Sequence, residues 1–198
     1  QTGSLEGTVA ISSPEGELLF YASGNTLWDR SHNVMQNGAG LLGFDSSASQ
    51  GGIVIPKPGS ETIYYIFGLD AYDSGFSYSE IDMILNNGFG AVTNNKNIQL
   101  NPQTLTEKVT AIHHANGKDI WVITHEVDNN NYVAYLVTEN GVTTTPIISS
   151  VGLFYPMGGY DYFAGQMKSS PDGKRLASSI VGLSMGEHRG VEVFDFNN

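Results

Sequence analysis

The sequence predicts an all-β protein: a β-propeller in which about four four-stranded blades are visible, as part of a larger propeller. Three observations support this prediction, namely a turn that recurs along the chain, strands that are apolar on both faces, and a high glycine content. Glycine accounts for 24 of the 198 residues, above the usual share of about 7%, as expected for many short strands joined by tight turns.

A turn built around glycine opens each repeat. In "KSSPDGKRLASS" (168–179), proline presets one backbone dihedral and glycine tolerates a positive φ. Three upstream segments have the same plan of an apolar stretch, a turn and a β-rich run: "ISSPEGELLFY" (11–21), "VIPKPGSETIYYIF" (54–67) and "IHHANGKDIWVIT" (112–124). Their turn glycines recur about every 40 to 60 residues, near the period of roughly 40–50 residues that is typical of propeller blades. The four glycines are Gly16, Gly59, Gly117 and Gly173.

A further strand is predicted after each of these runs. One of these segments, 78–85, could also form a helical turn, but the period-two alternation of Ile81, Met83 and Leu85 favours a strand. The predicted strands lie at 25–31, 78–85, 132–138 and 191–196, with outer strands at 97–100 and 144–149. We therefore expect one propeller region over 1–198, with blades at about 7–51, 52–108, 109–164 and 165–198.

The second strand of each repeat is apolar on both faces. In "DIWVIT", Ile120 and Val122 point to one side of the strand, while Trp121 and Ile123 point to the other. Such a strand must be covered on both sides, and without predicted helices the covering elements must be other sheets. Radial packing of small sheets provides this arrangement. A β-sandwich is the alternative, but it would show one polar face per strand.

Composition excludes several classes of function. The formal net charge is −11 and the chain has no run of Lys or Arg, so we expect no nucleic-acid partner. No apolar stretch is long enough for a membrane span, so we expect no membrane insertion. The absence of cysteine rules out disulfides, thiolate zinc sites and cysteine nucleophiles.

The turn of the last repeat, "SSPDGKRLA" (169–177), resembles the S-P-D-G-[KR]-x-[LI]-A signature of WD40-like bacterial propellers. This signature indicates a fold class and no particular function. Other segments extend the resemblance in order along the chain: "LEGTVAISSPEGELLFYASGNTLWDRSHNVMQNGAGLLG", "IVIPKPGSETIYYIF", "TEKVTAIHHANGKDIWVITHE", "YVAYLVTENGVTTTPIISSVG" and "VEVFDF". Together they resemble the N-terminal β-propeller region of large surface proteins of the phylum Bacteroidota, which are secreted by the type IX system.

Proteins of that family often continue into PKD-like or other adhesin-like modules and end in a sorting domain. The resemblance therefore implies an extracellular location, at the outer-membrane surface of a Gram-negative bacterium. It implies no shared catalytic residues. Because the chain begins almost at the first repeat and ends at "VEVFDFNN", we expect it to be a fragment of a longer protein.

Candidate binding residues are expected in loops on the face of the crossovers between blades, where function often resides. Longer loops are predicted there at 44–52, 68–77, 125–131, 152–166 and 182–190. The loop 152–166 combines Tyr155, Tyr160, Asp161 and Tyr162, a composition suited to stacking on sugar rings or peptide. The favoured interpretation is nevertheless that these aromatic side chains pack between neighbouring blades; Trp28 and Trp121 are likewise predicted to be core residues.

Metal and acid–base chemistry have weak signals. His125 and Glu126 could supply a ligand or a base, but no H-E-x-x-H motif is present, and a hydrogen-bonded loop edge is the favoured interpretation. Asp70 and Asp73 could offer oxygen ligands to Ca²⁺, although they lack EF-hand spacing. Apart from Ca²⁺, we expect no cofactor.

These observations predict a non-enzymatic, adhesin-like binding module at the cell surface. Its expected partner is a protein or a glycan, and the secretion machinery is a further expected contact. The first alternative is a carbohydrate-active or other hydrolytic propeller, which would need two acidic groups to converge. The acidic residues near the crossover face are Asp45, Asp70, Glu107, Glu126, Asp161 and Glu187. The second alternative is a passive spacer or secretion cargo.

Overall fold

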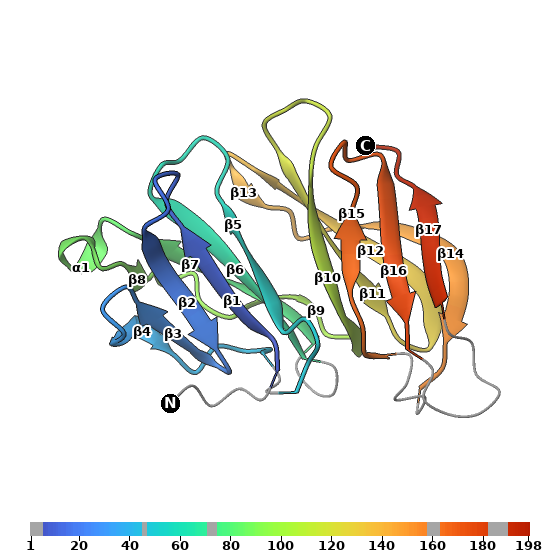
Figure 1. Cartoon of the computed structure of the whole chain (residues 1–198), viewed down its shortest axis with the longest axis horizontal. Coiled ribbons are helices and arrows are strands. Elements are labelled where there is room, and N and C mark those ends of the chain that lie inside the picture. The colour runs from blue at the N-terminus through green and yellow to red at the C-terminus, as the bar shows by residue number, and fades with distance from the viewer. Residues whose placement is uncertain (1–5, 45–46, 71–74, 158–162, 182–189) are drawn as a thin grey trace.

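The protein is all-β (Figure 1). The computed structural model describes residues 6–44, 47–70, 75–157, 163–181 and 190–198, which form four successive units of antiparallel strands. The first unit contains β1 (Thr8–Ser12), β2 (Leu18–Ser23), β3 (Thr26–Asp29) and β4 (Val34–Ala39). The second contains β5 (Gly52–Pro56), β6 (Ile63–Asp70), β7 (Gly75–Asp82), β8 (Ala91–Val92) and β9 (Ile98–Asn101). The third contains β10 (Leu105–His113), β11 (Ile120–Glu126), β12 (Asn129–Thr138), β13 (Gly141–Val142) and β14 (Ile147–Tyr155), and the fourth β15 (Met167–Ser169), β16 (Arg175–Ile180) and β17 (Gly190–Asp195).

Each unit begins with a hairpin closed by a glycine turn, as the sequence predicts. The turn glycines have positive φ: 89° at Gly16, 75° at Gly59, 71° at Gly117 and 67° at Gly173. In three of these turns the glycine N–H donates to the carbonyl three residues earlier, at 2.9 Å. The left-handed backbone explains why glycine stands at each of these positions.

The first two units share one sheet, whereas the sequence predicts separate sheets. A single parallel pair, Gln36 with Ala91, connects β4 to β8, and the end strands β1 and β5 lie beside each other, so that the sheet is nearly closed. Asn37, at φ 58°, supports this connection because its Nδ2 donates to the carbonyls of Val92 and Thr93, at 3.1 and 3.3 Å. The third and fourth units form sheets of their own.

Successive units pack face to face, and alternate residues of a central strand enter different cores. On β6, Phe67 lies in the core between the second and third units, and Ile66 in the core between the first and second. On β11, Val122 faces the second unit and Ile123 faces the fourth. The prediction that these strands are covered on both sides is confirmed, although one of the layers covering β6 is the first unit, which belongs to the same sheet.

The predicted strand 78–85 is wrong at its end. Strand β7 ends at Asp82, whose Oδ1 accepts a hydrogen bond from the Ile84 N–H at 3.1 Å and so turns the chain. The short helical segment α1 (Leu85–Gly88) follows, and Asn86 and Asn87 within it have positive φ, which asparagine tolerates well.

Strands extend into three of the predicted loops. Within 68–77, Asp70 of β6 pairs with Gly75 of β7, so both strands extend into the predicted loop. Within 125–131, β11 continues to Glu126 and β12 begins at Asn129. Likewise β14 extends to Tyr155, into the predicted loop 152–166, and the predicted outer strand 144–149 begins only at Ile147. The apolar pattern missed these ends because they are rich in Asp, Asn and Gly but are held by ladder hydrogen bonds.

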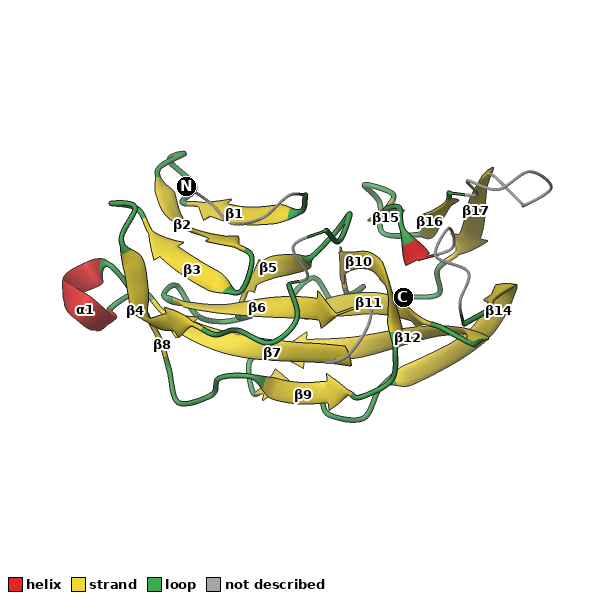
Figure 2. Cartoon of the chain, turned by 90° about the horizontal axis from the view of Figure 1, so that it is seen from below, coloured by secondary structure: helices red, strands yellow, loops and turns green. Residues whose placement is uncertain are grey.

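The first strands of the four units lie next to one another in chain order. Strand β1 lies beside β5, β5 beside β10, and β10 beside β15. Figure 2 shows these four strands along one concave side of the molecule, with the other strands of each unit leading away from it.

Candidate functional site

A hollow of about 310 Å³ lies among the first strands. Its walls come from the first strand of every unit, at 8–10 of β1, 52–54 of β5, 109–110 of β10 and Lys168 of β15, together with the segment 49–51. We call it the inner hollow. Threonine hydroxyls, the Gln50 amide and the Lys168 side chain belong to its lining residues, so it offers both donors and acceptors of hydrogen bonds.

Gln50 fixes the strands on the far side of the inner hollow. Its Oε1 accepts hydrogen bonds from the backbone N–H of Met167 at 2.8 Å and of Val109 at 3.2 Å. Its Nε2 donates to the Met167 carbonyl at 3.4 Å. One side chain from the segment before β5 therefore connects the first strands of the third and fourth units.

Ser49 makes a second connection beside Gln50. Its N–H and its hydroxyl both donate to Glu107 Oε2, at 2.7 and 2.9 Å, and its Oγ accepts from the Gly165 N–H at 3.2 Å. Because the Glu107 side chain is buried and accepts these bonds, its carboxylate acts in positioning the segment. Neither Ser49 nor Gln50 belongs to any motif in the sequence. The pattern of apolar and polar residues does not distinguish them from other loop residues either.

Two of the predicted site residues, His125 and Tyr155, come together between the third and fourth units. We use the term buried cluster for Lys108, His125, Tyr132, Tyr155 and Glu192. The ring centroids of His125 and Tyr155 are 4.3 Å apart, and those of His125 and Tyr132 are 4.5 Å apart. The Lys108 ammonium lies 4.5 Å from the centroid of the Tyr155 ring, a cation–π contact.

Glu192 of β17 connects the buried cluster to the fourth unit. Its Oε2 accepts hydrogen bonds from the hydroxyls of Tyr155 at 2.8 Å and Tyr132 at 3.4 Å. Its Oε1 accepts from the Leu153 N–H at 2.7 Å. Since Lys108, His125 and Tyr155 are fully buried, this cluster joins two units and presents no ring to solvent. Tyr155, the candidate site residue of the aromatic loop that lies within the described ranges, thus packs between units.

Burial controls the ionisation of the cluster. It lowers the pKa of His125 to about 4, and the hydrogen bond to the Glu126 carbonyl only partly opposes this effect. Because a carbonyl can only accept, His125 Nδ1 carries the proton in that bond. Burial also lowers the pKa of Lys108 to about 8, against the opposing charges of Glu192 and Glu107. It raises the pKa of Tyr132 and Tyr155.

Glu126 lies on the opposite face of β11 from His125, so the two do not form an acid–base pair. Its carboxylate accepts hydrogen bonds from the side-chain amides of Asn101 at 2.8 Å, Asn129 at 2.9 Å and Asn131 at 3.1 Å. Because three side-chain amides donate to it, the Glu126 carboxylate stabilises the β11–β12 hairpin. Within the described ranges, no group of three His, Asp or Glu side chains is arranged to hold a metal ion.

The remaining predicted site residues are only partly described. Asp70 ends β6 and lines a pocket with residues of the first unit. Asp73, Tyr160, Asp161 and Tyr162 lie outside the described residues. So do Asp45 and Glu187, which were candidates for a hydrolytic site.

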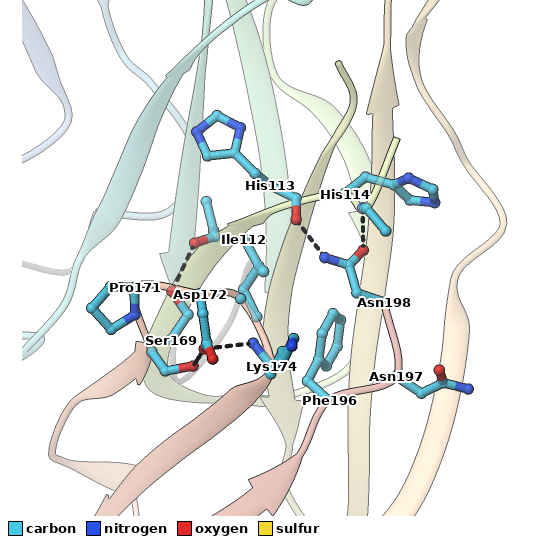
Figure 3. A pocket seen from close by; sticks show the side chains of 14 residues that line it. Ile112, His113, His114, Ser169, Pro171, Asp172, Lys174, Phe196, Asn197 and Asn198 are labelled. Carbon is cyan, nitrogen blue, oxygen red and sulfur yellow. Dashed lines mark hydrogen bonds between the residues drawn. The ribbon is translucent and has the colours of Figure 1, made fainter. Parts of the chain in front are cut away.

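A larger pocket, of about 720 Å³, lies between the opening turns of the third and fourth units (Figure 3). Asn198 closes one side of it: its side-chain amide accepts from the Ala115 N–H at 2.9 Å and from Trp121 Nε1 at 3.1 Å. On the other side, hydrogen bonds from the Ser170 hydroxyl and the Lys174 N–H lower the pKa of Asp172. A similar hollow of about 700 Å³ lies between the turns of the second and third units, so spaces of this kind follow from the repeat itself.

Comparisons with known proteins gave no match to a family model, a curated protein or a solved structure. Among the described residues, no helix has the length and apolar character needed to cross a membrane.

Proposed function

We propose that the chain forms consecutive blades of a β-propeller and serves as a non-enzymatic module that binds a protein or a glycan at the bacterial cell surface. The observation that supports this proposal is the inner hollow, to which the first strand of every unit contributes. In a propeller, the inner strands of the blades surround a central channel in this way.

The packing of the units supports a propeller that is larger than four blades. Central strands separate two cores, as radial sheets require. The outward face of β17 carries Val191 and Val193, which are 63% and 58% exposed. A following blade would cover these side chains as the third unit covers the second.

The chemistry of the described residues favours binding over hydrolysis. Glycoside hydrolysis uses two carboxyl groups that face one substrate. Glu107 and Glu126 instead accept hydrogen bonds in two separate sets that position the backbone and the hairpin. The inner hollow is lined by the neutral hydroxyl residues Thr8 and Thr110 and by one cation, Lys168, a lining that suits recognition of a polar ligand.

Glycan and peptide arrays probed with the purified chain test the binding proposal. We expect binding that the double variant Lys168→Ala, Thr110→Val weakens at least about tenfold, because it removes one charged and one neutral hydrogen-bonding group from the inner hollow. Lys118→Ala, an exposed turn lysine, is the control and should bind as the parent does. Array binding that the double variant leaves unchanged, or turnover of a bound polysaccharide, would contradict the proposal. Protease accessibility on intact cells tests the surface location.

A further inference from the structure

Each unit turns one face toward the unit before it and the other toward the unit after it. We call these its backward face and its forward face. The core between the first two units contains Phe20 of β2 and Ile66 of β6, and the core between the last two contains Ile123 of β11 and Leu176 of β16. Each core between units thus joins a forward face to a backward face. Among the described residues, the backward face of the first unit and the forward face of the fourth have no such neighbour.

The backward face of the first unit is apolar along its middle. Tyr21 and Trp28 pair across β2 and β3, and their half-buried rings are stacked with planes 11° apart. Trp28 in turn pairs with Val34 of β4, which is 49% exposed. Residues paired across strands share one side of a sheet, and Phe20 and Met35 point to the other side, into the core with the second unit. The paired side chains therefore belong to the backward face.

The forward face of the fourth unit is apolar at the matching place. Val191 and Val193 of β17 are 63% and 58% exposed, and Val193 pairs with the half-buried Ala177 of β16. Phe194, at the alternate position, packs against the core with the third unit. Exposed apolar surface of this kind is typical of an interaction site.

Charge favours the first unit of another copy as the neighbour of this forward face. The described part of the first unit carries four acidic side chains and one basic one, whereas the fourth unit carries three of each. Because Glu192 of the fourth unit points into the buried cluster, the outer surface of that unit is slightly basic. Opposite charges at two faces favour their association, and like charges oppose it.

The opening turns show this complementarity locally. Pockets lined by two consecutive opening turns show that these turns lie side by side in neighbouring units. The turn of the first unit carries the exposed Glu15 and Glu17, and the turn of the fourth leads into the exposed Lys174 and Arg175. If a first unit lay next to a fourth, acidic side chains would lie beside basic ones. Two first units would bring glutamates together instead.

We propose that a second copy of this chain covers both faces: the backward face of its first unit packs on the forward face of the fourth unit, and the reciprocal contact closes a ring. This inference rests on the propeller proposed above. A contact between two different faces forms a closed ring where its rotation allows. Two copies of four units make eight blades, within the range of about four to eight that propellers have. Strand β1 of one copy would lie beside β15 of the other, as it lies beside β5, and would complete the wall around the inner hollow.

Sedimentation velocity of the purified chain over a series of concentrations tests the proposal. We expect an equilibrium between one and two copies without larger species, because a closed ring leaves no free face. Val193→Asp should raise the dissociation constant at least about 100-fold, since it would bury an unpaired charge in the contact. Ile148→Asp is the matched control at a residue that is 55% exposed on β14 of the third unit, away from both end faces. It should associate as the parent does.

Mixing two variants tests whether different faces meet. Val34→Asp damages the backward face and Val193→Asp the forward face, so neither variant should associate alone. Their mixture should form pairs, because the intact forward face of the first variant can bind the intact backward face of the second. If identical faces met instead, one of the two variants would still associate alone.

Charge reversal tests the opening turns. Glu15→Lys with Glu17→Lys should weaken association roughly tenfold, the effect of a few exposed charge pairs. Adding Lys174→Glu and Arg175→Glu to the same chain should restore it, because every contact then carries opposite charges again.

Four outcomes overturn the proposal: a parent chain that stays single at every concentration, association of Val193→Asp equal to that of the parent, no pairing in the mixture, or species larger than two copies. A single parent chain that still binds on the glycan and peptide arrays would overturn only the ring. A paired chain that binds nothing on these arrays would contradict only the binding function proposed above.

Discussion

Replacing Tyr155 with alanine should lower the free energy of unfolding by about 4 kcal/mol, the usual cost of removing a fully buried large aromatic side chain. Tyr155 is 0% exposed, and its ring contacts both His125 and the Lys108 ammonium. Its removal would also take from Glu192 the 2.8 Å hydrogen bond that joins the third unit to the fourth. Urea denaturation followed by circular dichroism measures the loss.

Two variants separate the causes of this effect. Phe154→Ala changes the preceding residue, which is 55% exposed, and should cost less than about 1 kcal/mol. Tyr155→Phe keeps the ring but removes the hydroxyl, and should cost about 1–2 kcal/mol because Glu192 loses a donor. If Tyr155→Ala and Phe154→Ala were equally mild, the buried cluster would not join the two units.

Acidification should destabilise the protein through His125. Burial lowers the pKa of this imidazole from 6.5 to about 4, so between these pH values the unfolded chain binds a proton that the native protein does not. The free energy of unfolding therefore decreases as the pH falls from 6.5, and the contribution of His125 is lost completely near pH 4. A difference of this size corresponds to about 3 kcal/mol. The groups that surround the imidazole are Lys108, Tyr132 and Tyr155, while the Glu126 carboxylate acts on it from the other face of β11.

The measurement compares unfolding free energies at pH 7 and pH 4 for the parent and for His125→Gln. Carboxyl groups titrate over the same range in both proteins, so the informative quantity is the difference between the two pH dependences. His125→Gln should lose about 2–3 kcal/mol less than the parent on acidification. His113→Gln, a change at an exposed histidine at the end of β10, should follow the parent. Identical pH dependences for the parent and His125→Gln would show that His125 is accessible to protons in the native protein.

Much of the framework could be predicted from local sequence patterns. The four glycine turns require positive φ, and the structure has it at each of them. Strands such as β6 and β11 carry apolar residues on both faces, and this pattern predicted that both faces are covered. These features depend on a few neighbouring residues, so a single sequence contains them.

Features that depend on contacts across the chain could not be predicted. The parallel pair of Gln36 and Ala91 and the connections made by Gln50 to β10 and β15 join segments far apart in the sequence. Likewise, nothing local distinguishes Lys108 as a buried lysine, since the Tyr155 ring that lies 4.5 Å from its ammonium comes from a distant part of the sequence. The sequence analysis favoured a hydrogen-bonded loop edge for His125 and Glu126; both residues belong to β11, where they point to opposite faces of the strand.

The central claim is that the first strands of successive units lie side by side around one hollow, and proximity across the boundary of the third and fourth units tests it most directly. The chain has no cysteine, so introduced thiols are the only ones present. Ser169 Oγ of β15 lies 3.4 Å from the Ala111 carbonyl of β10, whereas Ala39 lies on β4, far from β10 in both views (Figures 1 and 2). With a short thiol cross-linker, the double variant Ala111→Cys, Ser169→Cys should cross-link within minutes and Ala111→Cys, Ala39→Cys should not. Failure of the first pair to react, or equal reaction of both pairs, would contradict the account.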